Sequence, residues 1–325
     1  MCAIMAQTTV ESYAIQSSNL ITTVRFSQQA PVILERGLTS ERSLIFSLIA
    51  NQEEPERYGI IEQLFFSCLQ TGDDRSALLC LERLTCRFGS SNEKVMGLRG
   101  LYEEAIAGDQ SDLEECLRKY DLSLSEHPLD LPILKRRIAL LRSMSRPVDA
   151  ITNLVELLKA VPTDAEAWCE LADLYQSQGM SSQAIFSLEE ALLIVPNAWN
   201  IHARLGEALY IFARTAEDEG FPQYLRKSIQ HFCRSVELCD DYLRGFYGLA
   251  LATSLQLEQE GPMNALRGLA SDFLYKEKIE GLNILARRKL EDIVKQRSAN
   301  CQLWEHAQGD LIAAKELVDR ISESH

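Results

Sequence analysis

Cysteine, histidine and paired acidic residues are the side chains of this sequence that could catalyse a reaction or bind a metal. The nine cysteines form no C-x-x-C pair, and the five histidines form neither H-x-x-x-H nor H-E-x-x-H. Acidic pairs such as Glu189 and Glu190 sit on consecutive residues; in a helix these point about 100° apart and cannot flank one substrate bond. We therefore expect no catalytic residue, no cofactor and no metal site.

The cysteines also indicate the redox environment of the chain. They are odd in number and fall mostly at apolar helical positions, which predicts reduced, buried thiols in a reducing compartment. The cysteines are Cys2, Cys68, Cys80, Cys86, Cys116, Cys169, Cys233, Cys239 and Cys301, and the histidines are His127, His202, His231, His306 and His325.

One stretch combines a cysteine beside a tryptophan with several carboxylates: EAWCELADLYQSQGMSSQAIFSLEEALLIVP, from Glu166 to Pro196. Counted from Ala165 as position 1 of a 34-residue unit, its large and small apolar residues recur at fixed places. Positions 4, 7, 8, 11, 20, 24, 27 and 32 are Trp168, Leu171, Ala172, Tyr175, Ala184, Leu188, Ala191 and Pro196. This pattern resembles the tetratricopeptide repeat, a hairpin of two antiparallel helices. The alanines allow close helix approach, so the pattern favours packing over a reactive thiol at Cys169.

The same unit recurs along the chain. Stepping back 34 residues keeps the pattern from Leu131 without a gap. Stepping forward starts a unit at Trp199, which holds about ten extra residues near Glu217 before the pattern resumes at Ser228. We predict an all-α tetratricopeptide-repeat solenoid with about six hairpins over residues 58–276. Residues 1–35 are predicted to be an arm that is partly extended or disordered, residues 36–57 a capping helix, and residues 277–325 C-terminal capping helices. Thr163 with Glu166 predicts a capping box, and Gly179 a left-handed helix end.

Composition narrows the partners of such an array. The 47 acidic against 33 basic residues give a net charge of -14, which disfavours nucleic acid and anionic lipid. The longest uncharged run, Gly245 to Leu257, is shorter than the roughly 20 residues of a membrane span. The first residues show no secretory signal. We expect a soluble, cytosolic protein whose charge attracts the basic cytosolic ends of membrane proteins.

In the tetratricopeptide family, the first helix of each hairpin lines a concave groove. The resemblance therefore implies a partner-binding groove, and the residues at the corresponding positions are Lys135, Arg136, Glu166, Cys169, Glu170, Asp173, Gln176, Asn200, Arg204 and Glu207. Acids fill most of the central unit. Family members that bind chaperone tails instead use Lys and Asn there to hold a peptide carboxylate, so this sequence departs from that type of adaptor.

Particular segments are similar, in order and spacing, to one branch of the superfamily, the family of subunit 2 of the endoplasmic reticulum membrane protein complex. The strongest are A-L-x-C-L-x-x-L at Ala77 to Leu84 and E-A-W-x-E-L-A-x-L-Y at Glu166 to Tyr175. The resemblance, over about residues 57–290, implies a non-catalytic cytosolic scaffold of a complex that inserts transmembrane segments, including tail-anchored ones. Its implied partners are cytosolic segments of membrane subunits and a peripheral subunit of metalloprotease-like fold.

Two other classes stay open on the sequence alone. A free peptide-binding adaptor or co-chaperone would use the same repeats, but would be monomeric and well behaved by itself, whereas a scaffold would expose apolar patches. An enzyme would depend on an exposed thiol at Cys86 or Cys2, for which the sequence offers no paired base.

Overall fold

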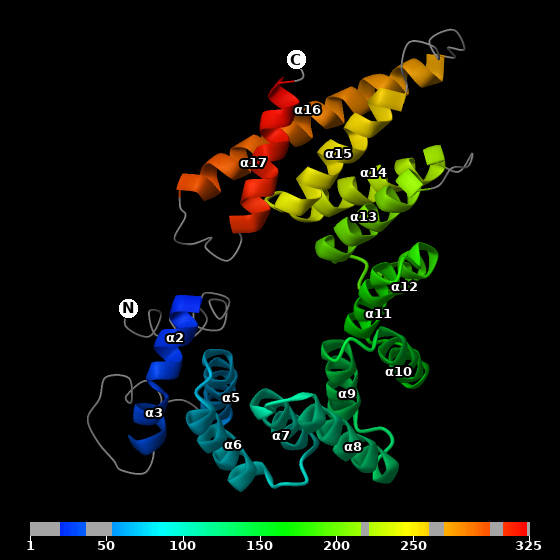
Figure 1. Cartoon of the computed structure of the whole chain (residues 1–325). Helices are drawn as coiled ribbons and strands as arrows, with labels where there is room; N and C mark the ends of the chain where they lie inside the picture. Colours follow the sequence, from blue (N-terminus) through cyan, green and yellow to red (C-terminus); the bar gives the residue numbers. More distant parts are fainter. Residues whose placement is uncertain (1–19, 37–53, 216–220, 260–269, 300–307, 324–325) are drawn as a thin grey trace. The chain divides into compact units, whose positions relative to one another are not determined.

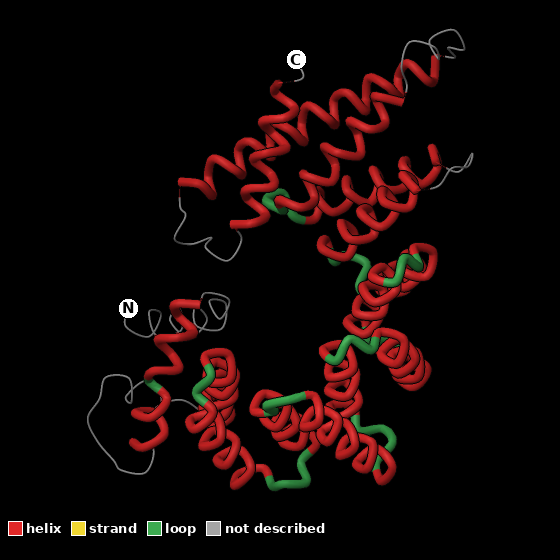
Figure 2. Tube along the Cα trace, viewed as in Figure 1, coloured by secondary structure: helices red, strands yellow, loops and turns green. Residues whose placement is uncertain are grey.

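The structure is a computed structural model that describes residues 20–36, 54–215, 221–259, 270–299 and 308–323. Within these ranges the chain consists of helices and short turns, with no strand (Figure 2). The predicted all-α tetratricopeptide-repeat solenoid is confirmed as the fold class. None of the described helices has both the length and the apolar character needed to cross a bilayer.

The helices are best read as consecutive pairs. Their bounds are α2 Leu20–Gln28, α3 Ala30–Arg36, α5 Glu54–Thr71, α6 Asp74–Phe88, α7 Glu93–Ile106, α8 Gln110–Glu126, α9 Leu131–Ser143, α10 Pro147–Ala160, α11 Ala165–Ser177, α12 Ser181–Ile194, α13 Trp199–Thr215, α14 Phe221–Leu238, α15 Leu243–Gln259, α16 Ala270–Ala299 and α17 Gln308–Glu323.

The chain divides into two compact units, residues 1–150 and 151–325, and α10 crosses the boundary. In the first unit, α5 packs on α6, α6 on α7, and α7 on both α8 and α9. In the second unit, α11 packs on α12, α12 on α13, α13 on α14, α14 on α15 and α15 on α16, while α17 lies against α15 and α16 (Figure 1). Within each unit, most helices therefore contact the helices next to them in sequence, as a repeat fold requires.

The repeat positions that define the pattern form the core of the α11–α12 hairpin. Leu171, Ala172, Ala184, Leu188 and Ala191 are at most 2% exposed. The aromatic positions are only half-buried. Trp168 donates its indole N–H to the Pro162 carbonyl at 2.9 Å, and Tyr175 lies near the end of α11. Pro196 lies two residues after the last residue of α12 and is exposed.

The ends of α11 differ from the prediction at one residue. The N-cap is Asp164, whose carboxylate accepts the Ala167 N–H at 3.1 Å, so the expected capping box of Thr163 is wrong by one position. Aspartate caps helices somewhat better than threonine, which explains the choice between the two neighbours. At the other end, Gly179 has φ of 72°, as predicted for a left-handed helix end.

The described part of the expected N-terminal arm is helical, not extended. Thr23, Ser27, Ala30 and Leu34 are buried and recur at helical spacing. The Ser27 hydroxyl contacts the Thr71 hydroxyl of α5 at 2.7 Å. Thr23 and Ser27 are polar, but their side chains are small enough to be buried where α2 packs on α5. Most of the predicted capping helix 36–57 lies outside the described residues.

The C-terminal boundary also differs from the prediction. The expected limit at residue 276 falls inside α16, which packs along α15 as the second helix of the sixth pair and continues to Ala299. Only α17 follows it as a cap among the described helices. Upstream, the α13–α14 hairpin is longer than its neighbour mainly because its helices are longer. They have 17 and 18 residues, against 13 in α11 and 14 in α12. The segment around Glu217 lies outside the described residues.

A phenylalanine seated between two glycines fixes the spacing of α13, α14 and α15. Phe232 is 4% exposed, and its ring would lie 3.1 Å from a Cβ at Gly206 and would overlap a Cβ at Gly248. A helical glycine normally lowers stability. Here it is required because any side chain at residue 248 would displace the ring.

We predict that Gly248→Ala lowers the free energy of unfolding by about 1–3 kcal/mol because the added methyl group forces Phe232 out of place. Gly281→Ala is the matched control, since no atom lies within 4 Å of its Cβ position in helix α16. That substitution should raise stability by about 0.5–1 kcal/mol. Urea unfolding followed by circular dichroism measures both. Equal effects of the two substitutions would contradict the packing assigned to Phe232.

Candidate binding groove

The residues predicted to line a groove occur in both units. Lys135 and Arg136 belong to α9 in the first unit, and the remaining eight belong to α11 and α13 in the second. Arg136 is half-buried and forms a two-pronged ion pair with Glu104 of α7, which also accepts the Tyr120 hydroxyl of α8. Its guanidinium therefore ties three helices of the first unit together, while Lys135 is exposed.

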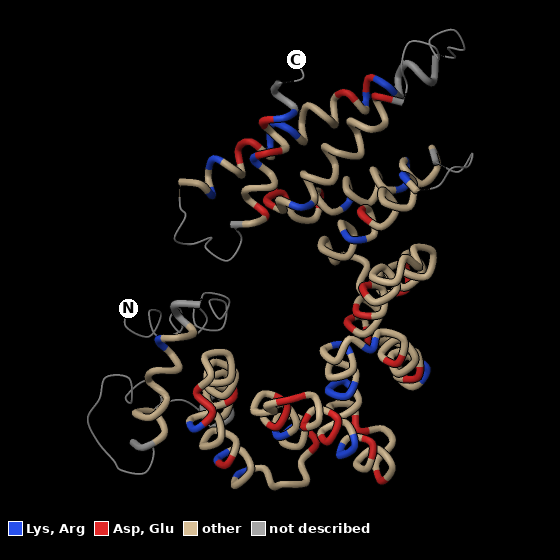
Figure 3. The backbone as a smooth tube through the Cα atoms, in the orientation of Figure 1, with Lys and Arg blue, Asp and Glu red and all other residues tan. Residues whose placement is uncertain are grey.

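Three carboxylates form a row along α11, which we call the acidic row: Glu166, Glu170 and Asp173. Their spacing of four and then three residues places them on one helix face. Glu166 lies in the first turn, where the helix dipole stabilises a negative charge. Glu166 and Asp173 are exposed and Glu170 is half-buried. Figure 3 marks the acidic residues along α11 in red. Gln176 continues the row by one turn and is exposed.

Arg204 connects α13 to the acidic row. It donates to the Cys169 carbonyl at 3.0 Å and pairs with the Asp173 carboxylate. The Asp173 carboxylate is half-exposed, so the pair contributes little to stability but holds the neighbouring first helices in register. The Asn200 and Glu207 side chains of α13 are exposed on either side of Arg204 in sequence. The structure thus brings together Cys169, Asp173 and Arg204 from the predicted set.

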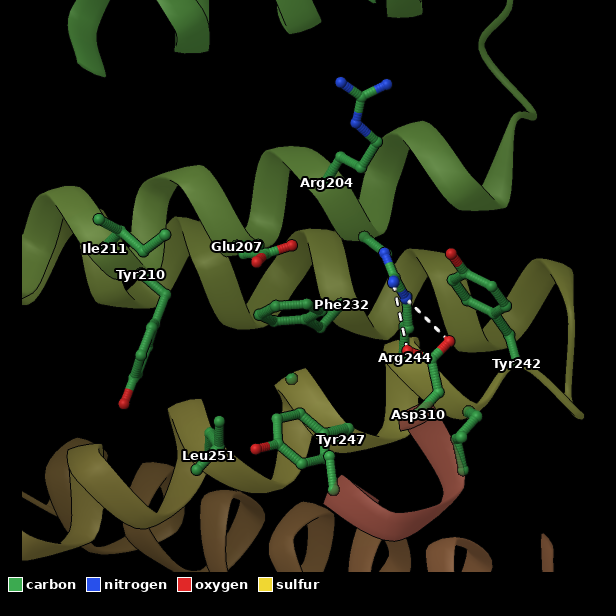
Figure 4. Close-up of a pocket in the computed structure, with 14 residues that line it drawn as sticks. Arg204, Glu207, Tyr210, Ile211, Phe232, Tyr242, Arg244, Tyr247, Leu251 and Asp310 are labelled. Atoms are coloured by element: carbon green, nitrogen blue, oxygen red, sulfur yellow. Dashed lines mark hydrogen bonds and ion pairs between the residues drawn. The ribbon is translucent and has the colours of Figure 1, made fainter. Parts of the chain in front are cut away.

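A cleft of about 360 Å³ opens next to Arg204, and we call it the tyrosine cleft. It is built from α13, α14, the start of α15 and the start of α17 (Figure 4). The lining residues are Ala203, Arg204, Glu207, Tyr210, Ile211, Phe232, Tyr242, Leu243, Arg244, Tyr247, Gly248, Leu251, Asp310 and Ala313. Apolar and aromatic groups dominate, with charged groups from α13, α15 and α17 among them. Such a cleft can hold an apolar side chain of a partner.

Charged residues define one edge of the tyrosine cleft. Arg244 at the start of α15 pairs with Asp310 at the start of α17 at 3.3 Å, which holds α17 beside the cleft. The Asp310 carboxylate raises the pKa of the Arg244 guanidinium. Burial raises the pKa of the neighbouring Tyr242. Arg204 points away from the other lining side chains in Figure 4, in agreement with its contacts to α11. Glu207 remains as an exposed carboxylate of the cleft.

Most of the described cysteines are packed among helices, and the thiols of Cys68 in α5 and Cys80 in α6 interact with each other. The seven cysteines within the described ranges form no disulfide with one another. Cys68, Cys80 and Cys116 are buried, while Cys86 is exposed on α6 and Cys2 lies outside the described residues. Burial raises the pKa of the Cys169 thiol, which keeps it protonated and unreactive. No group of three or more potential metal ligands occurs in the described part of the chain.

Two histidines, by contrast, are brought together by the fold. His202 of α13 and His231 of α14 stack with ring centroids 5.4 Å apart, and their Nδ1 atoms are 3.1 Å apart. His202 Nε2 lies 3.0 Å from the Pro196 carbonyl and must donate to it, so in the neutral ring His202 Nδ1 accepts from His231 Nδ1–H. Burial, then His202 and Lys227, lowers the pKa of His231 to about 4. The contact between the two rings joins α13 to α14.

Sequence reasoning missed most of the tyrosine cleft. Tyr210 and Ile211 follow the predicted positions of α13 by one turn and could have been found by extending the groove along that helix. Arg244 and Asp310 are 66 residues apart and belong to different elements. No local pattern relates them.

Comparisons with known proteins agree on one family. A family described as "EMC2 TPR-like repeat domain" matches residues 90–216. The "TPR repeat protein oca3" of Schizosaccharomyces pombe is 36% identical over 204 residues, covering 62% of this chain and 68% of that protein. "ER membrane protein complex subunit 2" of Xenopus tropicalis is 30% identical over 194 residues, covering 60% of this chain and 61% of that protein. The chain therefore spans about three fifths of the frog protein.

Among solved structures, the "Crystal structure of MamA protein" is 15% identical, with a TM-score of 0.44 over 65% of this chain and 94% of that one.

We predict that the histidine pair makes stability depend on pH. The pKa of His231 is about 4 in the folded chain against 6.5 in an unfolded one, so below about pH 6.5 the unfolded chain takes up the proton first. Stability should fall between pH 7 and 4, by on the order of 1–2 kcal/mol after allowance for solvent screening. His231→Gln should flatten this slope and His127→Gln, in an exposed turn, should not. Thermal unfolding from pH 4.5 to 7.5 measures the slopes. Identical slopes in all three proteins would contradict the assignment.

Proposed function

Because this chain belongs to the family of subunit 2 of the endoplasmic reticulum membrane protein complex, we propose that it is a non-catalytic scaffold of that complex. In this role it supports the insertion of transmembrane segments, including those of tail-anchored proteins, by holding other subunits together. The proposed partners are cytosolic segments of the membrane subunits and a peripheral subunit of metalloprotease-like fold. The proposed location is the cytosolic face of the endoplasmic reticulum membrane, where partner subunits hold the chain.

The observation that carries this proposal is the acidic row beside the tyrosine cleft. Cytosolic segments that flank membrane spans are rich in Lys and Arg. Carboxylates at Glu166, Glu170 and Glu207 attract such segments and orient them. The cleft then supplies a place for an apolar side chain of the same segment, which gives the contact its affinity.

The geometry is less suited to the adaptors that capture chaperone tails. Those proteins hold a peptide carboxylate with cations, whereas Arg204 is occupied by Asp173 and the Cys169 carbonyl. Arg244 is likewise paired with Asp310. A free adaptor or co-chaperone for a different, basic motif remains the second candidate because the cleft could hold the anchor of a short peptide. The two candidates differ in whether the chain is permanently assembled with other subunits.

We predict that reversing the acidic row, by E166K/E170K/D173K in the full chain, lowers recovery of membrane subunits about tenfold or more. Each reversal replaces attraction by repulsion along the path of a basic segment. The measurement is quantitative affinity purification from detergent-solubilised membranes. The variant E166K/E170K keeps the Asp173–Arg204 pair, so α13 should stay in place. It should still lower the recovery of membrane subunits, by a smaller factor, because two carboxylates of the row are reversed.

The matched control is E126K/E156K/E237K, which changes the net charge by the same amount at exposed sites on second helices of hairpins. It should leave recovery unchanged. Full recovery of all subunits with a folded E166K/E170K/D173K protein would refute the role of the acidic row. Recovery of no membrane subunit even with the unaltered chain would refute the scaffold function and favour a free adaptor.

A further inference from the structure

The outward side of α12 is unusual because it is apolar. Phe186 is 54% exposed and Leu193 is 77% exposed, although the opposite face of the same helix already forms the core of its hairpin. Seven residues turn an α-helix by almost two full turns, so the two side chains lie on one line about 10 Å apart. Glu189 and Glu190 project on either side of that line. We call these four residues the α12 outer stripe.

Corresponding positions on the neighbouring second helices are polar. In the repeat register, Phe186 corresponds to Thr152 of α10 and Gln230 of α14, and Leu193 corresponds to Lys159 and Glu237. Those residues are what an exposed helix face normally carries. Among α10, α12 and α14, only α12 therefore carries apolar residues at both positions, and the packing of the hairpin does not require them.

The surroundings of the stripe extend its apolar character. The Phe186 ring contacts the Trp168 ring edge to face, with centroids 6.2 Å apart. The half-buried Trp168 ring thus adds to the apolar surface beside Phe186. Accessible aliphatic and aromatic side chains are typical of a protein interface.

We propose that the α12 outer stripe binds an amphipathic helix of a partner protein whose apolar face is flanked by Lys or Arg. Leu193 and Phe186 are spaced to receive the apolar residues of one helix face, which recur over two turns. Glu189 and Glu190 are the only charged residues of α12, so a basic helix matches the stripe on both sides. The stripe belongs to the second helix of its hairpin, so this contact is additional to that of the acidic row and does not rest on the function proposed above.

The charges argue against two other occupants. A second copy of this chain seated on the same stripe would place Glu189 and Glu190 against themselves, and like charges at an interface are unfavourable. A membrane surface rich in anionic lipid would be repelled by the same carboxylates. A basic protein helix fits both the apolar and the charged part of the stripe.

The test places a photo-crosslinking phenylalanine analogue, p-benzoylphenylalanine, at residue 186 of the full chain in cells, with the same analogue at Thr152 as control. Thr152 is exposed at the corresponding position of α10. The crosslinked peptide is then identified by mass spectrometry. We expect a peptide with apolar residues three, four or seven apart and adjacent Lys or Arg, at a yield several-fold above that at residue 152.

A variant then tests the chemistry of the contact. F186T/L193K gives α12 the residues that α10 carries, and it should lower recovery of the crosslinked partner about tenfold or more, since two exposed apolar anchors are lost. Its thermal midpoint should fall by only a few degrees, because both side chains are exposed and only the contact of Phe186 with Trp168 is lost. The proposal is overturned by crosslinks only to this chain, to lipid or to an acidic peptide, by a yield no higher than at residue 152, or by unchanged recovery with F186T/L193K. None of these outcomes depends on the acidic row.

Discussion

The close approach of paired helices at residues with little or no side chain is the constraint on which this structure depends. Ala172, Ala184 and Ala191 are almost completely buried between α11 and its neighbours. Farther along the chain, Gly206 and Gly248 leave room for the Phe232 ring between α13 and α15. A close-packed contact of this kind fixes the rotation of each helix about its own axis. The direction of every exposed side chain follows from that rotation.

Because the core positions are fixed, the remaining positions of the repeat are available for binding. We propose that the acidic row uses such positions on the first helix of a hairpin and that the α12 outer stripe uses them on the second. Helix α13 combines packing and binding positions. Its Arg204 joins it to α11, while its Glu207 lines the tyrosine cleft. Binding surfaces of different chemistry can thus be carried by one hairpin without changing its core.

The predictable part of the fold is the part with a period. The 34-residue pattern around Trp168 and Ala184 identified the hairpins, their core residues and the fold class, because each position repeats the same local packing. The helices α2 and α3 were not predicted, since their buried Thr23 and Ser27 look polar in sequence and are buried only through contact with α5. The end of the array was placed too early because nothing local distinguishes a second helix from a cap.

Contacts between residues far apart in sequence could not be predicted. The sequence predicts the acidic row and Arg204 as groove residues because of their positions in the repeat, and the structure shows that Arg204 contacts Asp173. It did not indicate that Asp310 of α17 pairs with Arg244, or that His202 and His231 stack, since those residues come from separate helices. The residues of the α12 outer stripe can be read from the sequence, but only the structure shows that Leu193 is exposed and not part of the core.

Hydrogen–deuterium exchange of the full chain, alone and within the purified assembly, tests the central claim most directly. If α11 and α13 bind a partner segment through the acidic row and the tyrosine cleft, their amides should exchange more slowly in the assembly than in the free chain. Unchanged exchange in both helices, in an assembly shown to be intact, would contradict the account.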